Sequence, residues 1–262
     1  MPWAIGEGAR AARRRAGQRP RARTTSRANQ PRDCPAAATA WRTAMKLTMP
    51  EEIMLLLLDD KTGRPIGLPA PAGDYAVASA ILMQLSLDNR IDTDPERLMV
   101  TSHKPSGDPV LDEALTLIST NLGMRDSRHW IVELGRQGDH YRSMILDRLV
   151  AKGVLKKEEG RFLWVFPDRR YPKAAEGEAE VLEVRARLRK VLLEDDIPEP
   201  HDSLMIGLAR ASGIIPLILT PAEQDKVGKR VDQVADLEEL GRTLSAVTRE
   251  VYAMMLAFAG AH

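Results

Sequence analysis

The stretch from Asp139 to Pro167, DHYRSMILDRLVAKGVLKKEEGRFLWVFP, predicts an amphipathic helix that runs directly into a β-hairpin. Apolar side chains recur in its first half at four-residue spacing, which places them on one face of a helix. They are Tyr141, Ile145 and Leu149. Gly153 follows them, and a glycine in this position is typical of a helix end. We take this helix and hairpin as the unit around which the rest of the chain is arranged.

The hairpin is expected to carry aromatic residues on its returning strand. Val154–Leu155 and Arg161–Phe166 are rich in β-branched and aromatic residues, as strands are. Lys156–Gly160, between them, has the composition of a polar turn. Alternation along a strand places three aromatic side chains on one face, namely Phe162, Trp164 and Phe166. We expect these residues to contact a membrane or a second copy of the chain, with packing into the core as the alternative.

Apolar periodicity predicts helices on both sides of this unit. The expected helices cover residues 49–58, 74–87, 109–120, 127–134, 178–193, 203–212, 221–231 and 237–259, with short strands near Ile91 and at 98–100. Two capping boxes mark helix starts, at Thr48–Glu51 and Thr220–Glu223. Asp74 is expected to cap the helix that follows the proline-rich loop 64–73. The predicted fold is therefore mainly α, a single large helical domain with a protruding β-hairpin after an amphipathic helix.

Three further details belong to this prediction. Residues 167–177 are expected to form a polar connector after the hairpin. The charged helix that follows is expected to bury an apolar stripe formed by Leu182, Leu188 and Leu192. The last helix is expected to break near Gly241.

The charge of the chain is unevenly distributed. Ten arginines against Glu7 and Asp33 give residues 1–45 a charge of +8, and because the whole chain carries +1, the remainder carries −7. Residues 1–45 lack any hydrophobic period and are expected to be a basic, disordered segment, with residues 46–260 forming the helical domain. The single Cys34 permits no disulfide within the chain, and no apolar run is long enough to span a membrane. We therefore expect a cytoplasmic protein.

Signatures of catalysis are scarce. The sequence contains no G-x-S-x-G, no phosphate-binding glycine loop, no H-E-x-x-H and no C-x-x-C. The paired acids Asp59–Asp60 and Asp195–Asp196 occur at expected turns, where carboxylates are common. We expect no enzymatic activity, no cofactor and no metal site.

Four blocks, in order along the chain, resemble the Golgi phosphoprotein 3 family. They are LTMPEEIMLLLLDDKTG at 47–63, GDPVLDEAL at 107–115, RLVAKGVL through RFLWVF at 148–166, and LMIGLARASGIIPLIL with KRV at 204–219 and 229–231. The resemblance covers residues 46–258. The Ala- and Arg-rich composition indicates a bacterial-type member.

The resemblance implies a helical, peripheral membrane adaptor that binds phosphatidylinositol 4-phosphate. Of the four head-group residues of the family, an Arg is present at Arg142. The family's Trp corresponds to Leu68–Pro69, its first Arg to Val77–Ala78, and the partner of Arg142 to Asp139. We therefore expect Arg142 to bind an anionic phospholipid, which by resemblance is a phosphoinositide. The alternative is that Arg142 pairs with Asp139 or Glu133.

Two other functions stay open. The helix and hairpin are also typical of a winged helix, with residues 143–152 reading DNA. Its expected exposed face carries Arg142, Asp147, Arg148 and Lys152, which is a weak cationic surface on an acidic body, so we expect no nucleic acid. The second open function is that of a homo-oligomeric scaffold, which associates through the hairpin, as the resemblance implies, and binds no lipid.

Overall fold

Helices make up most of the described chain, as the apolar periodicity predicts. This is a computed structural model, and it describes residues 46–68, 70–94, 96–121, 123–162, 166–237 and 239–259, all in one compact unit within Met45–His262. The helices are α2 (Met49–Leu56), α3 (Ala70–Leu87), α4 (Pro109–Thr120), α5 (Ser127–Arg136), α6 (Gly138–Ala151), α7 (Ala175–Leu193), α8 (Pro200–Ala211), α9 (Pro221–Ala235), α10 (Glu239–Ala259) and the 3-10 helix η1 (Ile215–Leu217). The strands are β1 (Ile91–Thr93), β2 (Leu98–Val100), β3 (Glu158–Phe162) and β4 (Phe166–Arg170).

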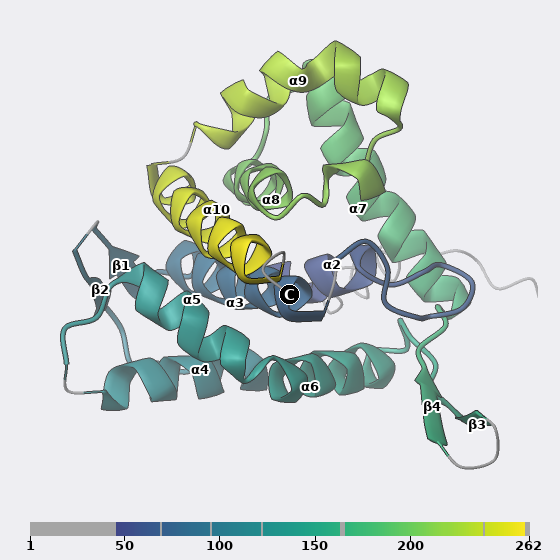
Figure 1. Ribbon diagram of the computed structural model, residues 1–262, viewed down its shortest axis with the longest axis horizontal. Coiled ribbons are helices and arrows are strands. Elements are labelled where there is room, and N and C mark those ends of the chain that lie inside the picture. The colour runs from purple at the N-terminus through teal and green to yellow at the C-terminus, as the bar shows by residue number, and fades with distance from the viewer. Residues whose placement is uncertain are drawn as a thin grey trace, which may run out of the picture. The chain divides into compact units, whose positions relative to one another are not determined.

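Helix α3 is the centre of the fold because it is apolar on every side. Each residue from Ala76 to Met83 is at most 1% exposed, as expected for a helix without a polar face. Helices α2, α4, α5, α6, α8 and α10 all contact it. In Figure 1, α4 and α6 lie on one side of α3, and α8 and α10 lie on the other. Helix α2 is equally buried, as the run Ile53–Leu58 predicts.

Most helix starts follow the predicted signals. Both capping boxes are formed, with the Thr48 N–H donating to Glu51 and the Thr220 N–H donating to Glu223. Asp108 accepts the N–H of Val110 at 2.9 Å and begins α4. The expected start of α3 is wrong, because the helix begins at Ala70 and Asp74 lies inside it. Proline is compatible with the first turn of a helix, so this part of the proline-rich segment is helical.

The hairpin is real, but its predicted register is wrong. Strand β3 begins at Glu158, inside the expected turn, and β4 runs to Arg170, inside the expected connector. In the backbone register, Glu158 is paired with Arg170 and Glu159 with Arg169. The aromatic segment therefore spans the two ends of the strands, with Phe162 facing Phe166.

Two expectations for the later helices are also wrong. Leu182 on α7 is 64% exposed, and the buried stripe is formed by Val181, Val184, Leu188, Val191 and Leu192. Helix α10 continues through Gly241 without a break. The predicted short strands are confirmed as the antiparallel pair β1–β2, in which Ile91 faces Val100.

Candidate functional site

A cavity of about 230 Å³ lies between the end of α2, the loop after it, the start of α3 and α6. Its apolar and glycine lining is Met54, Leu57, Leu58, Gly63, Pro65, Ile66, Leu68, Gly73, Val77 and Leu146, with Tyr171 from the segment after β4. Among the described residues that line it, Arg142 is the one that carries a charge. The cavity is thus an apolar space with Arg142 in its wall.

The loop that closes this cavity is held by local turn chemistry. Asp59 accepts the N–H of Thr62 at 2.7 Å, which forms the tight turn. Gly63 follows with a φ of +62°, and a Cβ built on it would lie 2.1 Å from the carbonyl carbon of Tyr171. Only glycine fits this close approach. The turn therefore brings the loop against the segment that follows the hairpin.

Arg142 lies in the first turns of α6, between two carboxylates. Its Nη1 donates to Asp74 of α3, and its Nη2 donates to Asp139, one turn earlier on α6. The Arg142 side chain is 28% exposed and that of Asp74 is 13% exposed, whereas that of Asp139 is 98% exposed. The expected pairing with Asp139 is present, while Glu133 pairs with Arg136. Arg142 thus has one partly buried partner, Asp74, and one fully exposed partner, Asp139.

Asp74 reaches Arg142 because the first residue of α6 has no side chain. A Cβ built on Gly138 would lie 2.2 Å from Cγ of Asp74. Burial is the main influence on the Asp74 carboxyl and raises its pKa above the ordinary value, against the opposing effect of Arg142. The ion pair with Arg142 therefore compensates only in part for the desolvation of the Asp74 carboxylate.

The structure brings together three of the positions that the family resemblance assigns to head-group binding. Leu68, Val77 and Arg142 come from a loop and two helices, and all three line the one cavity. Sequence reasoning missed Asp74, which it assigned to a helix cap. Asp139 could be predicted as a partner because it lies three positions before Arg142 on the same helix. No local pattern connects Asp74 with α6.

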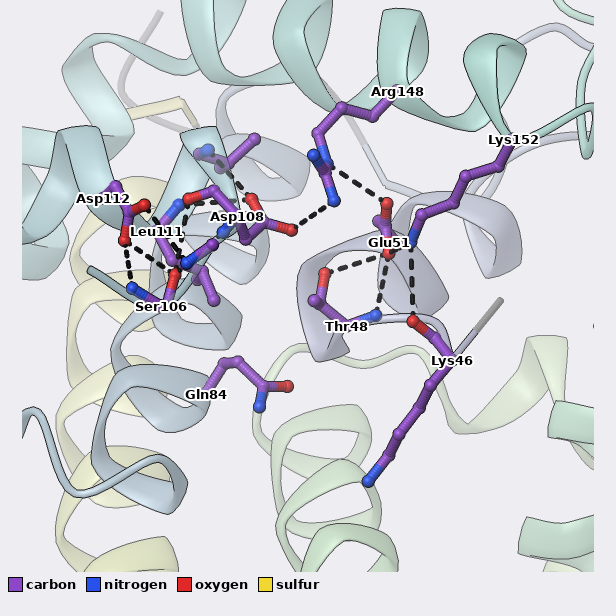
Figure 2. Close-up of polar contacts among 12 residues, drawn as sticks. Lys46, Thr48, Glu51, Gln84, Ser106, Asp108, Leu111, Asp112, Arg148 and Lys152 are labelled. Atoms are coloured by element: carbon purple, nitrogen blue, oxygen red, sulfur yellow. Dashed lines mark hydrogen bonds and ion pairs between the residues drawn. The ribbon is translucent and has the colours of Figure 1, made fainter. Parts of the chain in front are cut away.

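A second polar cluster ties α6 to α2. The Glu51 side chain is 1% exposed and accepts from Lys152 Nζ at 2.6 Å, while Arg148 approaches it at 3.4 Å and contacts Asp108 at 2.8 Å. Figure 2 shows Glu51 between these two α6 side chains and Thr48. Arg148 and Lys152 were expected on an exposed face, and this is wrong, because their side chains are only 25% and 19% exposed. The charges of Arg148 and Lys152 are therefore paired with carboxylates within the fold.

The aromatic residues of the hairpin are only partly described. Trp164 lies outside the described residues, and for Phe162 and Phe166 the backbone alone is described. In Figure 1 the two strands project from the helical body. The contacts expected of these aromatic side chains stay predictions.

Two classes of feature are missing from the described residues. No described helix has the length and apolarity needed to cross a membrane. Within the same part of the chain, no three His, Cys, Asp or Glu side chains are grouped so that they would hold a metal ion.

The described chain is a mainly helical body with a projecting β-hairpin and a mostly apolar cavity. The family model described as Golgi phosphoprotein 3 (GPP34) matches residues 49–254. The chain belongs to the Golgi phosphoprotein 3 family.

The sequence is also similar to that of a eukaryotic protein. It is vacuolar protein sorting-associated protein 74 of Schizosaccharomyces pombe, which is 27% identical over 138 residues. The match covers 45% of this chain and 41% of that protein, so the chain spans less than half the length of this relative.

Proposed function

We propose that the protein is a non-enzymatic peripheral membrane adaptor, at the cytoplasmic surface of a membrane, that binds the anionic phosphate of a phospholipid head group through Arg142. The observation that carries the proposal is the position of Arg142 at the wall of an otherwise uncharged cavity. A guanidinium matches the geometry of phosphate oxygens. Membership of the Golgi phosphoprotein 3 family supports the adaptor role, as does a relative named for protein sorting.

The local backbone adds to the attraction for a phosphate. Arg142 is in the second turn of α6, and the helix dipole favours an anion at this end. A phosphate reaches Arg142 by displacing Asp139, whose side chain is 98% exposed. An exposed ion pair of this kind contributes at most about 1 kcal/mol, so the exchange costs little.

The size of the cavity limits what it holds. At about 230 Å³ it is smaller than the roughly 300–1,000 Å³ of pockets for drug-sized ligands. It accommodates the apolar part next to a head group rather than a whole lipid. A phosphoinositide, the head group that the family resemblance implies, remains one of the lipids to compare.

Flotation with vesicles tests this function. Vesicles of phosphatidylcholine with increasing phosphatidylglycerol are mixed with the full chain and with Arg142→Gln. Arg136→Gln is the matched control, because Arg136 forms an exposed pair with Glu133 on α5 and does not line the cavity. We expect binding to rise with the anionic lipid and to be lost only in Arg142→Gln. Equal loss in both variants would show nonspecific charge attraction instead.

A homo-oligomeric scaffold that binds no lipid is a second candidate. It is favoured by the pairing of both Arg142 terminal nitrogens with carboxylates and by the projecting hairpin. Sedimentation of the full chain and of Trp164→Ala tests it. A self-associated wild type, a monomeric variant and no vesicle binding would together establish the scaffold in place of the lipid adaptor.

A further inference from the structure

Two carboxylates flank the one charged residue among the described residues that line the apolar cavity. One guanidinium, Arg142, contacts two carboxylates, Asp74 and Asp139, so these three side chains sum to −1. Lys173, two residues after the lining Tyr171, has a side chain that is 1% exposed and donates to Asp60 and to the carbonyl of Leu58. The Lys173 charge is thus paired within the fold, and Arg142 is the cation among the described residues that line the cavity.

A ligand that matches this arrangement carries charges of both signs. Its phosphate pairs with Arg142, and a positive group a few bonds away pairs with the carboxylate that the phosphate releases. We propose that the head group bound here is a zwitterionic phosphoethanolamine, with the phosphate on Arg142 and the ammonium on Asp139. The inference rests on the proposed lipid-binding function and names the class of head group.

A primary ammonium fits this site better than a quaternary one. Each carboxylate accepts hydrogen bonds, and an ammonium has three N–H donors, whereas choline has none. Charge-assisted hydrogen bonds are about twice as strong as neutral ones. Asp139 is free to provide the contact because its side chain is 98% exposed, while Asp74 remains on the buried side of Arg142.

A head group with several phosphates fits this site less well. Each added negative charge would approach Asp74 and Asp139, and like charges at close range oppose binding. The two family positions that, by the resemblance, would supply further cations are occupied here by Val77–Ala78 and by Asp139. The charge arrangement therefore selects against polyanionic lipids.

The test compares vesicles of four compositions with the full chain. Phosphatidylcholine is the base, and phosphatidylethanolamine, phosphatidylglycerol or phosphatidylinositol 4-phosphate is added in equal amounts. Phosphatidylcholine is the matched control because it has the same net charge as phosphatidylethanolamine without N–H donors. We expect the strongest binding with phosphatidylethanolamine. Soluble glycerophosphoethanolamine should compete and inorganic phosphate should compete weakly, because the ammonium contributes to recognition.

Asp139→Asn provides the most informative variant because it replaces a side chain that is 98% exposed, so we expect the fold to be retained. Binding to phosphatidylethanolamine should fall about two- to fivefold, the value of one exposed ion pair, while binding to phosphatidylglycerol should rise by a similar factor. Opposite changes for two lipids in one protein cannot result from misfolding. Asp74→Asn is the second variant and should shift the preference in the same direction.

Three results would overturn the inference. Stronger binding to phosphatidylglycerol than to phosphatidylethanolamine in the wild type would refute the zwitterionic head group and leave the proposed function standing. Binding to phosphatidylethanolamine that is unchanged in Asp139→Asn would show that bilayer packing, not this site, attracts the protein. A folded protein that binds none of the vesicles would refute both proposals.

Discussion

Replacing Glu51 by Gln should destabilise the fold far more than the same change at Glu223. Both residues close a capping box, and both accept the N–H of their threonine, at 2.8 Å and 2.9 Å. Glu51 is 1% exposed and also holds Lys152 and Arg148, whereas Glu223 lies partly exposed and pairs with Arg189. The two variants therefore make the same change to a cap in two electrostatic environments.

The magnitude follows from what Glu51→Gln leaves behind. Removing one partner of a buried ion pair costs about 3–5 kcal/mol, because the other charge is left without compensation. Lys152 and Arg148 keep some access to solvent, and Arg148 keeps Asp108 at 2.8 Å. These contacts favour the low end, about 3 kcal/mol, which lowers the Tm of a domain of this size by roughly 6–12 °C.

Thermal and urea unfolding, followed by far-UV circular dichroism, measure this difference. Glu223→Gln should lower the Tm by clearly less than Glu51→Gln. Adding Lys152→Met to Glu51→Gln should recover part of the loss, because the unpaired cation is removed. Equal effects of the two glutamine variants, with no recovery in the double variant, would refute the reasoning, since the cap alone would then account for both.

Three further predictions follow from the described contacts. Arg189 and Thr220 lower the pKa of Glu223 from 4.5 to about 2. The stabilising effect of Glu223 should therefore be complete above pH 4.5 and disappear as the pH falls through about 2. The Tm difference between wild type and Glu223→Gln should vanish over the same pH window. Burial raises the pKa of Tyr141 to about 12, and its hydroxyl has no hydrogen-bond partner among the described residues. Tyr141→Phe should therefore stabilise the fold by up to about 1 kcal/mol in urea unfolding. A loss of stability would instead show that the hydroxyl has a partner. Gly138→Ala should cost about 1–3 kcal/mol by the same measurement, because a Cβ there meets Asp74 at 2.2 Å, and a neutral effect would show that Asp74 moves aside freely.

The helical body could be predicted because its signals are local. Capping boxes, the Asp108 cap and apolar periodicity lie within a few residues of the helices that they define. The start of α3 could not be predicted in this way, because Pro71 is compatible both with a loop and with a first helical turn. On α7, leucine spacing alone was misleading, since Val181 and Val184 complete the buried stripe and leave Leu182 in solvent.

The hairpin register depends on partners that are distant in the sequence. Glu158 and Arg170 face each other across the two strands, and no local pattern shows this pairing. Residues 158–160 have the composition of a turn and nevertheless form a strand. The register therefore has to be read from the fold and not from the local composition.

Prediction of the site was incomplete for a similar reason. Arg142 was found through the family resemblance, and Asp139 through its spacing on the same helix. Asp74 comes from α3, and its contact with Arg142 depends on the space that Gly138 leaves between two helices. A contact of this kind requires the packing of the fold.

The most direct test of the central claim is hydrogen–deuterium exchange of the full chain with a short-chain, water-soluble phosphatidylethanolamine. The account predicts slower exchange in residues 57–68 and in the first turns of α6, where the cavity and Arg142 lie, and no such change in Arg142→Gln. Unchanged exchange around the cavity, or slower exchange confined to the β3–β4 hairpin, would contradict the claim that Arg142 and this cavity bind the phospholipid.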